Sequence, residues 1–115
     1  MNREKILLDY RVRILNALSD PLRLEIVELL KDGERCVCDI IPFFGRSQST
    51  ISKHLDVLYQ VGILDRRVEG KRTIYNIKDT QILNILRELD IFVLNQISSL
   101  TKAIKLPETQ QSDKR

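Results

Sequence analysis

The spacing of apolar residues along the chain predicts four longer helices. These helices cover residues 3–18, 21–32, 48–61 and 80–104. The two middle helices also have their own end signals. Asp20 and Ser47 are suited to cap the amino ends, and Gly33 and Gly62 are suited to stop the carboxyl ends. Leu22, Ile26, Leu29 and Leu30 are expected to form the buried stripe of the first of these two.

The remaining segments either alternate apolar and polar residues or contain residues that interrupt a helix. Ile63–Val68 and Arg72–Ile77 alternate around Glu69-Gly70-Lys71, which predicts a β-hairpin with a basic tip. Asp39–Gly45 can form only a short helix, because Pro42 is tolerated only in a first turn. A helix-turn-helix followed by a hairpin is a winged helix. The predicted fold class is therefore mainly α with a small β-hairpin, a winged helix-turn-helix.

The length of 115 residues and the 43% of hydrophobic residues fit a single domain. We expect residues 1–106 to form the winged helix-turn-helix with its terminal helices, and residues 107–115 to be a disordered polar tail. The first residues alternate charged and apolar groups, unlike a signal peptide. Apolar runs such as Ile91–Leu94 are far too short to span a membrane. These patterns predict a soluble cytoplasmic protein without a membrane partner.

The helix over 48–61 has one apolar stripe and one polar face. On a helical wheel Leu55 and Leu58 fall within about 40° of Ile51, so the three residues are expected in the core. The first turn of the second helix in a helix-turn-helix meets DNA base edges. Cations of the hairpin would flank the same surface and bind phosphates. The residues predicted to bind double-stranded DNA are Arg46, Gln48, Ser49, Thr50, Ser52, Lys53, Arg67, Lys71 and Arg72.

The net charge of +3 is compatible with a polyanion partner but does not by itself indicate one. His54 lies at the margin of the core stripe, where we expect it to donate a hydrogen bond to a backbone group. A thiolate at Cys38 with His54 as its base is the one arrangement that would suggest an enzyme. No oxyanion hole or glycine-rich phosphate loop accompanies it, so we predict that the chain is not an enzyme. A protein-interaction module that has kept the fold without binding DNA is a further alternative.

Four segments carry a resemblance to a known family: "DPLRLEIVELL", "ERCVCDI", "SQSTISKHLDVLYQVGIL" and "DRRVEGKRTIYNI". In this order, over about residues 11–77, they resemble the ArsR-type (arsenic-repressor) family of winged-helix regulators. The C-V-C-D element is similar to that of the branch that senses arsenite and related soft ions. The resemblance implies a homodimeric repressor that leaves its operator when the ion binds.

Cys36 and Cys38 are the two thiols of the chain. Residues i and i+2 point about 200° apart in a helix but share one face of an extended segment. Gly33 ends one helix and Asp39 is expected to begin the next, so a bend here could bring the two sulfurs together. Cys38 would then lie near an N-cap, where the helix dipole favours a thiolate.

Cys36 and Cys38 are therefore the predicted metal ligands, with arsenite or antimonite favoured as the inducer and no permanent cofactor. Arsenite prefers three thiolates, and the chain has no third cysteine. A small thiol, hydroxide, water or another group would supply the third ligand. Cadmium, lead and copper(I) are further candidates because they are soft ions.

Two other interpretations of the pair stay open. In the first, the two cysteines form a disulfide, and the protein is a thiol-based redox-responsive repressor. In the second, both cysteines only fill space as small apolar side chains, and the protein is a winged-helix regulator without cysteine sensing. The last predicted helix offers the carboxylates Glu88 and Asp90, with Asp79 just before it, but no histidine. This argues against a zinc- or nickel-type site there.

The last predicted helix carries more apolar surface than one face needs. Leu83, Ile91 and Leu94 fall outside its main stripe. Surplus apolar area on a small domain usually marks a partner surface. Together with the amphipathic helix at the amino end, it predicts a two-fold homodimer formed through the terminal helices.

Overall fold

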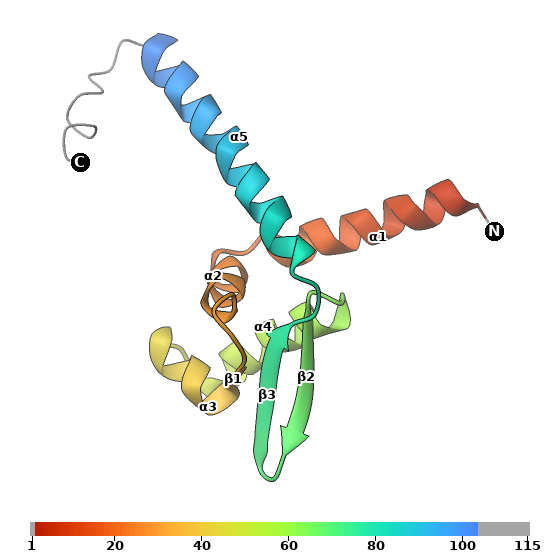
Figure 1. The fold of residues 1–115 in the computed structure, drawn as a ribbon, viewed down its shortest axis with the longest axis vertical. Helices are drawn as coiled ribbons and strands as arrows, with labels where there is room; N and C mark the ends of the chain where they lie inside the picture. The colour runs from red at the N-terminus through yellow and green to blue at the C-terminus, as the bar shows by residue number, and fades with distance from the viewer. Residues whose placement is uncertain (1, 104–115) are drawn as a thin grey trace. The chain divides into compact units, whose positions relative to one another are not determined.

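A computed structural model of the chain describes residues 2–103. The elements in chain order are α1 (Arg3–Leu18), α2 (Pro21–Leu30), β1 (Arg35–Cys36), α3 (Val37–Ile40), the 3-10 turn η1 (Ile41–Phe43), α4 (Gln48–Gln60), β2 (Leu64–Glu69), β3 (Arg72–Ile77) and α5 (Gln81–Ala103) (Figure 1). The predicted fold class, mainly helical with a small antiparallel sheet, is confirmed. The described residues fall into two units, which divide after Thr80.

The predicted amino ends of α2 and α4 are confirmed by their hydrogen bonds. The carboxylate of Asp20 accepts the backbone N–H groups of Leu22 and Arg23 at 2.9 and 3.2 Å, with Pro21 in the first turn. The hydroxyl of Ser47 accepts the N–H of Thr50 at 3.2 Å. These side chains satisfy donors that the first turn of a helix leaves without a partner. The backbone alone could not do this, so α2 and α4 begin where they do.

The core of the first unit lies between α2, α4 and the sheet. Ile51, Leu55 and Leu58 of α4 are fully buried, as their spacing predicts. In α2 the expected stripe is wrong at one position: Leu29 is only half-buried, whereas Val27 is fully buried. A ten-residue helix covered by both α4 and the sheet buries a wider arc than one stripe. This packing holds α4 by its apolar face and leaves its polar face outward.

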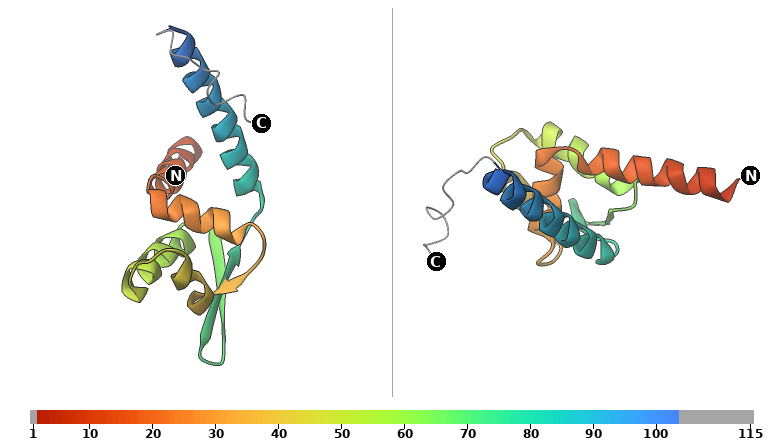
Figure 2. Two further views of the ribbon diagram at one scale, coloured as in Figure 1. Left: turned by 90° about the vertical axis from the view of Figure 1, so that its left-hand side faces the viewer. Right: turned by 90° about the horizontal axis from the view of Figure 1, so that it is seen from above.

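The predicted hairpin is confirmed, and a further strand joins it. The sheet has three strands in the order β1-β3-β2, all antiparallel. Gly70 begins the two-residue turn with φ of +63°, a conformation that favours glycine. Strand β1 places Cys36 opposite Ile74 of β3. The β2–β3 hairpin extends beyond α3 and α4 as a wing (Figures 1 and 2). Its strand β3 is the middle strand of the sheet and is hydrogen-bonded to the cysteine segment through β1.

The described part of the second unit is the 23-residue helix α5. Large apolar side chains are exposed along it and along α1. On α5 they are Ile85, Leu89, Ile91, Phe92, Val93, Leu94, Ile97 and Leu100, and on α1 Ile6, Leu7, Leu8, Tyr10, Val12 and Leu15. No described helix is long and apolar enough to cross a membrane. The predicted boundary at residue 106 and the polar tail lie outside the described residues.

Candidate functional site

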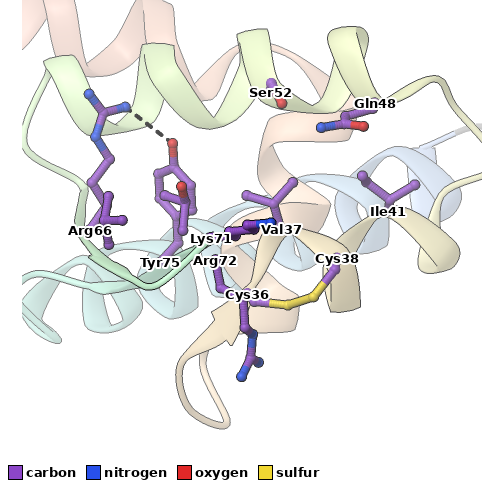
Figure 3. A pocket seen from close by; sticks show the side chains of 12 residues that line it. Cys36, Val37, Cys38, Ile41, Gln48, Ser52, Arg66, Lys71, Arg72 and Tyr75 are labelled. Atoms are coloured by element: carbon purple, nitrogen blue, oxygen red, sulfur yellow. Dashed lines mark hydrogen bonds between the residues drawn. A yellow bond between two sulfur atoms is a disulfide. The ribbon is translucent and has the colours of Figure 1, made fainter.

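A groove of about 480 Å³ brings the cysteine segment, α4 and the wing together (Figure 3). The cysteine segment and η1 contribute Cys36, Val37, Cys38 and Ile41. The start of α4 contributes Gln48 and Ser52. The wing contributes Arg66, Val68, Lys71, Arg72, Thr73 and Tyr75. The predicted sensor residues and four of the predicted DNA-binding residues therefore line one groove.

The two cysteines lie at the junction of β1 and α3. Their sulfurs are joined in a disulfide, with Cα atoms 5.2 Å apart (Figure 3). Cys36 is buried, whereas Cys38 is exposed. The expectation that the helix begins at Asp39 is wrong, whereas Cys38 does lie near the N-cap, as the second residue of α3. Cys36 is the N-cap, since its sulfur accepts the N–H of Asp39 at 3.2 Å and α3 begins at Val37. Pairing with β3 ends the extended chain at Cys36, two residues earlier than expected.

A third donor, Asp39, lies beside the two sulfurs. One carboxylate oxygen of Asp39 and the sulfurs of Cys36 and Cys38 all lie within 4.8 Å of one another. The same carboxylate is 3.9 Å from a guanidinium nitrogen of Arg72. Two thiolates and one carboxylate fit a soft ion once the disulfide is reduced, because soft ions bind thiolates. Asp39 is not among the ligands predicted from the sequence, although it is the last residue of the C-V-C-D element.

The predicted DNA-binding residues at the start of α4 differ in their surroundings. Gln48 and Ser52 face the groove, while Ser49 and Lys53 are exposed to solvent. Thr50 is half-buried, and its hydroxyl accepts a hydrogen bond from the hydroxyl of Ser47 at 3.0 Å. Thr50 is thus engaged within the cap, and the hydroxyl of Ser49 also lies 3.3 Å from that of Ser47.

The cations around the groove fall into a paired and an unpaired set. Arg67 donates to both carboxylate oxygens of Glu34, at 2.6 and 2.8 Å, and to Glu69 at 2.7 Å. Arg66 donates to Asp56 at 3.1 Å and to the hydroxyl of Tyr75 at 3.2 Å. Its guanidinium also stacks on the ring of Tyr59.

Within residues 2–103, Arg46, Lys53 and Lys71 make no ion pair with a carboxylate. All three are exposed. An exposed cation without a carboxylate partner can bind a phosphate without first breaking an internal contact. These three residues are therefore the cations best prepared for a polyanion.

The Arg67–Glu34 pair gives a pH-dependent prediction. The hydrogen bonds from Arg67 hold the pKa of the Glu34 carboxyl below its usual value. The pair therefore contributes to stability above the pKa of Glu34 in the unfolded chain, and the contribution is lost as the pH falls through the lowered value. In Arg67→Gln we expect the pKa of Glu34 to rise toward its usual range, as measured by an NMR titration of its carboxyl carbon.

Asp20 is the internal control for this titration. Partial burial raises the pKa of Asp20, but hydrogen bonds from the N–H groups of Arg23 and Leu22 lower it and prevail. Because Arg67 does not contact Asp20, the lowered pKa of Asp20 should persist in the variant. An unchanged pKa of Glu34 in the variant would contradict the bidentate pairing.

His54 does not have the partner that the sequence predicted. Its Nδ1 lies 3.1 Å from a guanidinium nitrogen of Arg23, so the expected bond to a backbone group is wrong. Arg23 also donates to the carbonyl oxygens of Ala17 at 2.6 Å and Asn16 at 3.4 Å. One arginine thus joins the end of α1, the start of α2 and the middle of α4. The sequence gives no signal for a contact between residues 31 positions apart.

Comparisons with known proteins agree with this arrangement. The model of the family described as "Bacterial regulatory protein, arsR family" matches residues 20–66. The arsenical resistance operon repressor of Staphylococcus xylosus is 36% identical over 95 residues, which cover 83% of this chain and 91% of that protein. The cadmium resistance transcriptional regulatory protein CadC of Listeria innocua is 43% identical over 70 residues, covering 60% of this chain and 59% of that protein.

A solved structure has the same fold. It is the homodimeric winged helix-turn-helix DNA-binding domain from Mycobacterium bovis, described as a possible ArsR-family transcriptional regulator. The TM-score is 0.77 and the sequence identity is 29%, over 86% of this chain and 92% of that one. The shared winged helix-turn-helix, the family match and the similarity to a repressor over nine-tenths of its length agree: the chain belongs to the arsR family, whose members are DNA-binding transcriptional regulators and not enzymes.

Proposed function

We propose that this chain is a homodimeric repressor that leaves its operator when a soft ion binds Cys36 and Cys38, with arsenite or antimonite as the favoured inducer. The observation that carries the proposal is the meeting of three donor atoms of Cys36, Cys38 and Asp39 within 4.8 Å of one another. The two cysteines line the same groove as Gln48 and Lys71. Relatives named for arsenical and cadmium resistance support a soft ion as the signal. Such a protein acts in the cytoplasm, where its DNA lies and thiols stay reduced.

The arsenite reaction needs no oxidant. Arsenite is As(OH)₃ at neutral pH, and two thiols each replace one hydroxyl group. Two As–S bonds form, two As–O bonds break, and two water molecules leave with the thiol protons. The third arsenic position keeps its hydroxide, so arsenite is held by Cys36 and Cys38 without a third thiol.

DNA binding is assigned to the start of α4 and to the wing. The first turn of α4 enters the major groove, where Gln48, Ser49 and Ser52 meet base edges. Phosphates are bound by cations on both sides of that turn. The full proposed set is Arg46, Gln48, Ser49, Thr50, Ser52, Lys53, Arg67, Lys71 and Arg72. Arg67 and Arg72 carry ion pairs in the free protein, so they exchange or share a carboxylate partner when they bind phosphate.

The homodimer is assigned to the exposed apolar residues of α1 and α5. Exposed apolar surface of this extent on a small domain usually marks a protein–protein interface, because burying it against a partner removes it from water. The Mycobacterium bovis relative with the same fold is described as homodimeric. A two-fold pair of winged helices reads a two-fold operator, which is how helix-turn-helix dimers bind DNA.

The signal has a short path to the wing. Cys36 pairs through the backbone with Ile74 in the middle strand of the sheet. An ion bound by Cys36 and Cys38 changes the positions of the two sulfurs. Because Cys36 is paired with β3, this change also acts on the strand that carries the wing residues. Release of DNA follows when the wing and the start of α4 no longer match the operator.

A second candidate function is a redox switch, and the Cys36–Cys38 disulfide in the structure favours it. A peroxide would form this bond, because the two thiols lose two protons and two electrons, which the peroxide takes up. Hydrogen peroxide is reduced to two molecules of water, and an organic hydroperoxide to one alcohol and one water. Because the ion and the disulfide need the same two sulfurs, an oxidised protein cannot bind the ion. The two functions can therefore be separated by experiment.

The test is fluorescence anisotropy of the reduced protein on DNA from upstream of its own gene. We expect arsenite to release the wild type and to leave the Cys36→Ser/Cys38→Ser variant bound. A parallel titration with hydrogen peroxide examines the redox function. Release of the wild type by peroxide alone would replace the ion sensor with the redox switch. Binding unaffected by either reagent would contradict both.

A further inference from the structure

We propose that Arg66 is a positioning residue for DNA binding. It holds the wing against α4, so that Lys71 and Arg72 at the wing tip keep a fixed place beside the first turn of this helix, with which they share a groove. The inference rests on the proposed function, because it takes α4 and the wing as the DNA-binding elements. It goes beyond that function by giving a task to a wing cation outside the proposed DNA-binding set.

Strand β2 directs the side chain of Arg66 toward α4. Side chains alternate between the two faces of a strand, so Leu64 and Arg66 share one face, and Asp65 and Arg67 share the other. Leu64 is buried and Arg66 is half-buried, whereas Asp65 and Arg67 are exposed. Because β2 packs against α4, the shielded face is the one that carries Arg66.

The guanidinium of Arg66 contacts three groups. Its Nη1 donates to a carboxylate oxygen of Asp56 on α4 at 3.1 Å and to the hydroxyl of Tyr75 on β3 at 3.2 Å (Figure 3). Its central carbon lies 3.8 Å from the centre of the ring of Tyr59 on α4. Asp56 and Tyr59 are three residues apart and therefore lie on one face of the helix. One side chain thus joins β2, β3 and α4.

Tyr75 gives this contact a fixed base. It is the cross-strand partner of Arg66 in the hairpin, and it is only 4% exposed. On its other side it is paired with Arg35 of β1. If Arg66 turned outward to a phosphate, the hydroxyl of this buried tyrosine would lose a hydrogen bond, which costs free energy. The arrangement therefore favours a guanidinium that stays between the wing and α4.

The wing tip depends on this contact because little else supports β2 there. Arg67, Val68 and Glu69, which follow Arg66 toward the turn, are all exposed. A two-stranded ribbon by itself is only marginally stable in water. The direction of the tip is therefore decided where the hairpin is still packed, and Arg66 is the last residue of β2 at which it is.

Asp56→Asn separates positioning from phosphate binding, because the two roles predict opposite results. A phosphate-binding Arg66 would be freed by the loss of Asp56, and operator binding would tighten. A positioning Arg66 would hold the wing less firmly, and the wing would have to be ordered when DNA binds. We therefore expect Asp56→Asn to bind the operator roughly three- to tenfold more weakly than the matched control Asp65→Asn.

The control removes the same charge next to the same arginine. The carboxylate of Asp65 accepts the backbone N–H of Arg66 at 2.9 Å, a bond that an asparagine oxygen can also accept. Comparing the two variants thus cancels the general effect of net charge on DNA binding. The side chain of Asp56 is 54% exposed, so its change to asparagine leaves the core intact.

Arg66→Lys and Arg66→Gln complete the test. Lysine keeps the charge but cannot stack and donate as a planar group, so both variants should weaken operator binding by roughly tenfold. Because Arg66 binds no phosphate, both should keep the wild-type slope of log K against log salt. In the Arg66→Gln background, Asp56→Asn should cause no further weakening relative to Asp65→Asn. Fluorescence anisotropy over a salt series measures all of these values, and urea unfolding shows that each variant is folded.

Two results would overturn the inference in favour of a phosphate contact. One is tighter binding by Asp56→Asn than by Asp65→Asn, and the other is a slope lower by roughly 2 in Arg66→Gln, the value for one phosphate contact in each protomer. Wild-type affinity of both Arg66 variants would overturn it as well. An unchanged affinity and slope in Lys71→Gln/Arg72→Gln would instead overturn the assignment of DNA binding to the wing.

Discussion

Replacing Leu55 with alanine should lower the free energy of unfolding by about 2–5 kcal/mol. Leu55 is fully buried in the middle of α4, between Ile51 and Leu58, which are also fully buried. Truncation removes apolar contacts and leaves a cavity that α2 and the sheet cannot fill without moving. Because the apolar face is what holds α4 in place, operator binding should be lost together with stability.

Urea unfolding followed by circular dichroism measures this loss. All variants are compared at one protomer concentration, since the stability of a dimer depends on it. Leu55→Met keeps the volume and should cost less than about 1.5 kcal/mol. Val68→Ala, at a wing position that is 70% exposed, should change the stability little. A loss below about 1 kcal/mol in Leu55→Ala would contradict the burial of this side chain.

Changing Arg46 and Lys71 to glutamine should weaken operator binding by roughly a hundredfold per protomer at low salt, or about ten-thousandfold for the dimer, since hydrogen bonds to charged groups contribute about 1.5 kcal/mol or more each. Both residues are exposed and lack a carboxylate partner among the residues that the structure describes. They flank the first turn of α4 from its preceding loop and from the wing tip. The loss should be similar for any DNA sequence, because phosphate contacts carry no sequence information.

The dependence on salt tests the location of these contacts. The slope of log K against log salt should fall by about 0.9 for each lost phosphate contact, or roughly 4 for two protomers. Lys5→Gln/Lys31→Gln removes the same charge from α1 and the end of α2, where each lysine is paired with a carboxylate. This control should keep a slope close to that of the wild type. Equal weakening in both variants would show that net charge, and not the position of Arg46 and Lys71, governs binding.

The sequence predicted those features of the fold that neighbouring residues decide. The caps at Asp20 and Ser47 act on donors two or three residues away, and the stripe of Ile51, Leu55 and Leu58 follows from helical geometry. The hairpin likewise depends on alternation and on one glycine at the turn. Each of these predictions is confirmed because the interaction partners are close in sequence.

The predictions that failed depend on distant partners. Strand β1 is two residues long, which is too short for any period to show, and it exists because β3 lies beside it. That pairing moved the start of α3 to Val37 and made Cys36 the cap. The contacts of Arg23 with His54 and of Arg67 with Glu34 join residues 31 and 33 positions apart. Only the assembled fold brings such pairs together, so the sequence could name the wing cations but not those already paired.

Arg23 has a consequence for the operators that such a dimer accepts. Its guanidinium bonds to the last turn of α1 and to His54 of α4, so the angle between these two helices is set inside each protomer. In a dimer joined partly through α1, that angle fixes the separation of the two recognition helices. In the proposed dimer, Arg23 and the packing of α2 on α1 and α4 then help to set the length of the spacer between operator halves. We expect DNA with one base pair inserted at the centre to bind more weakly, even when its outer bases match.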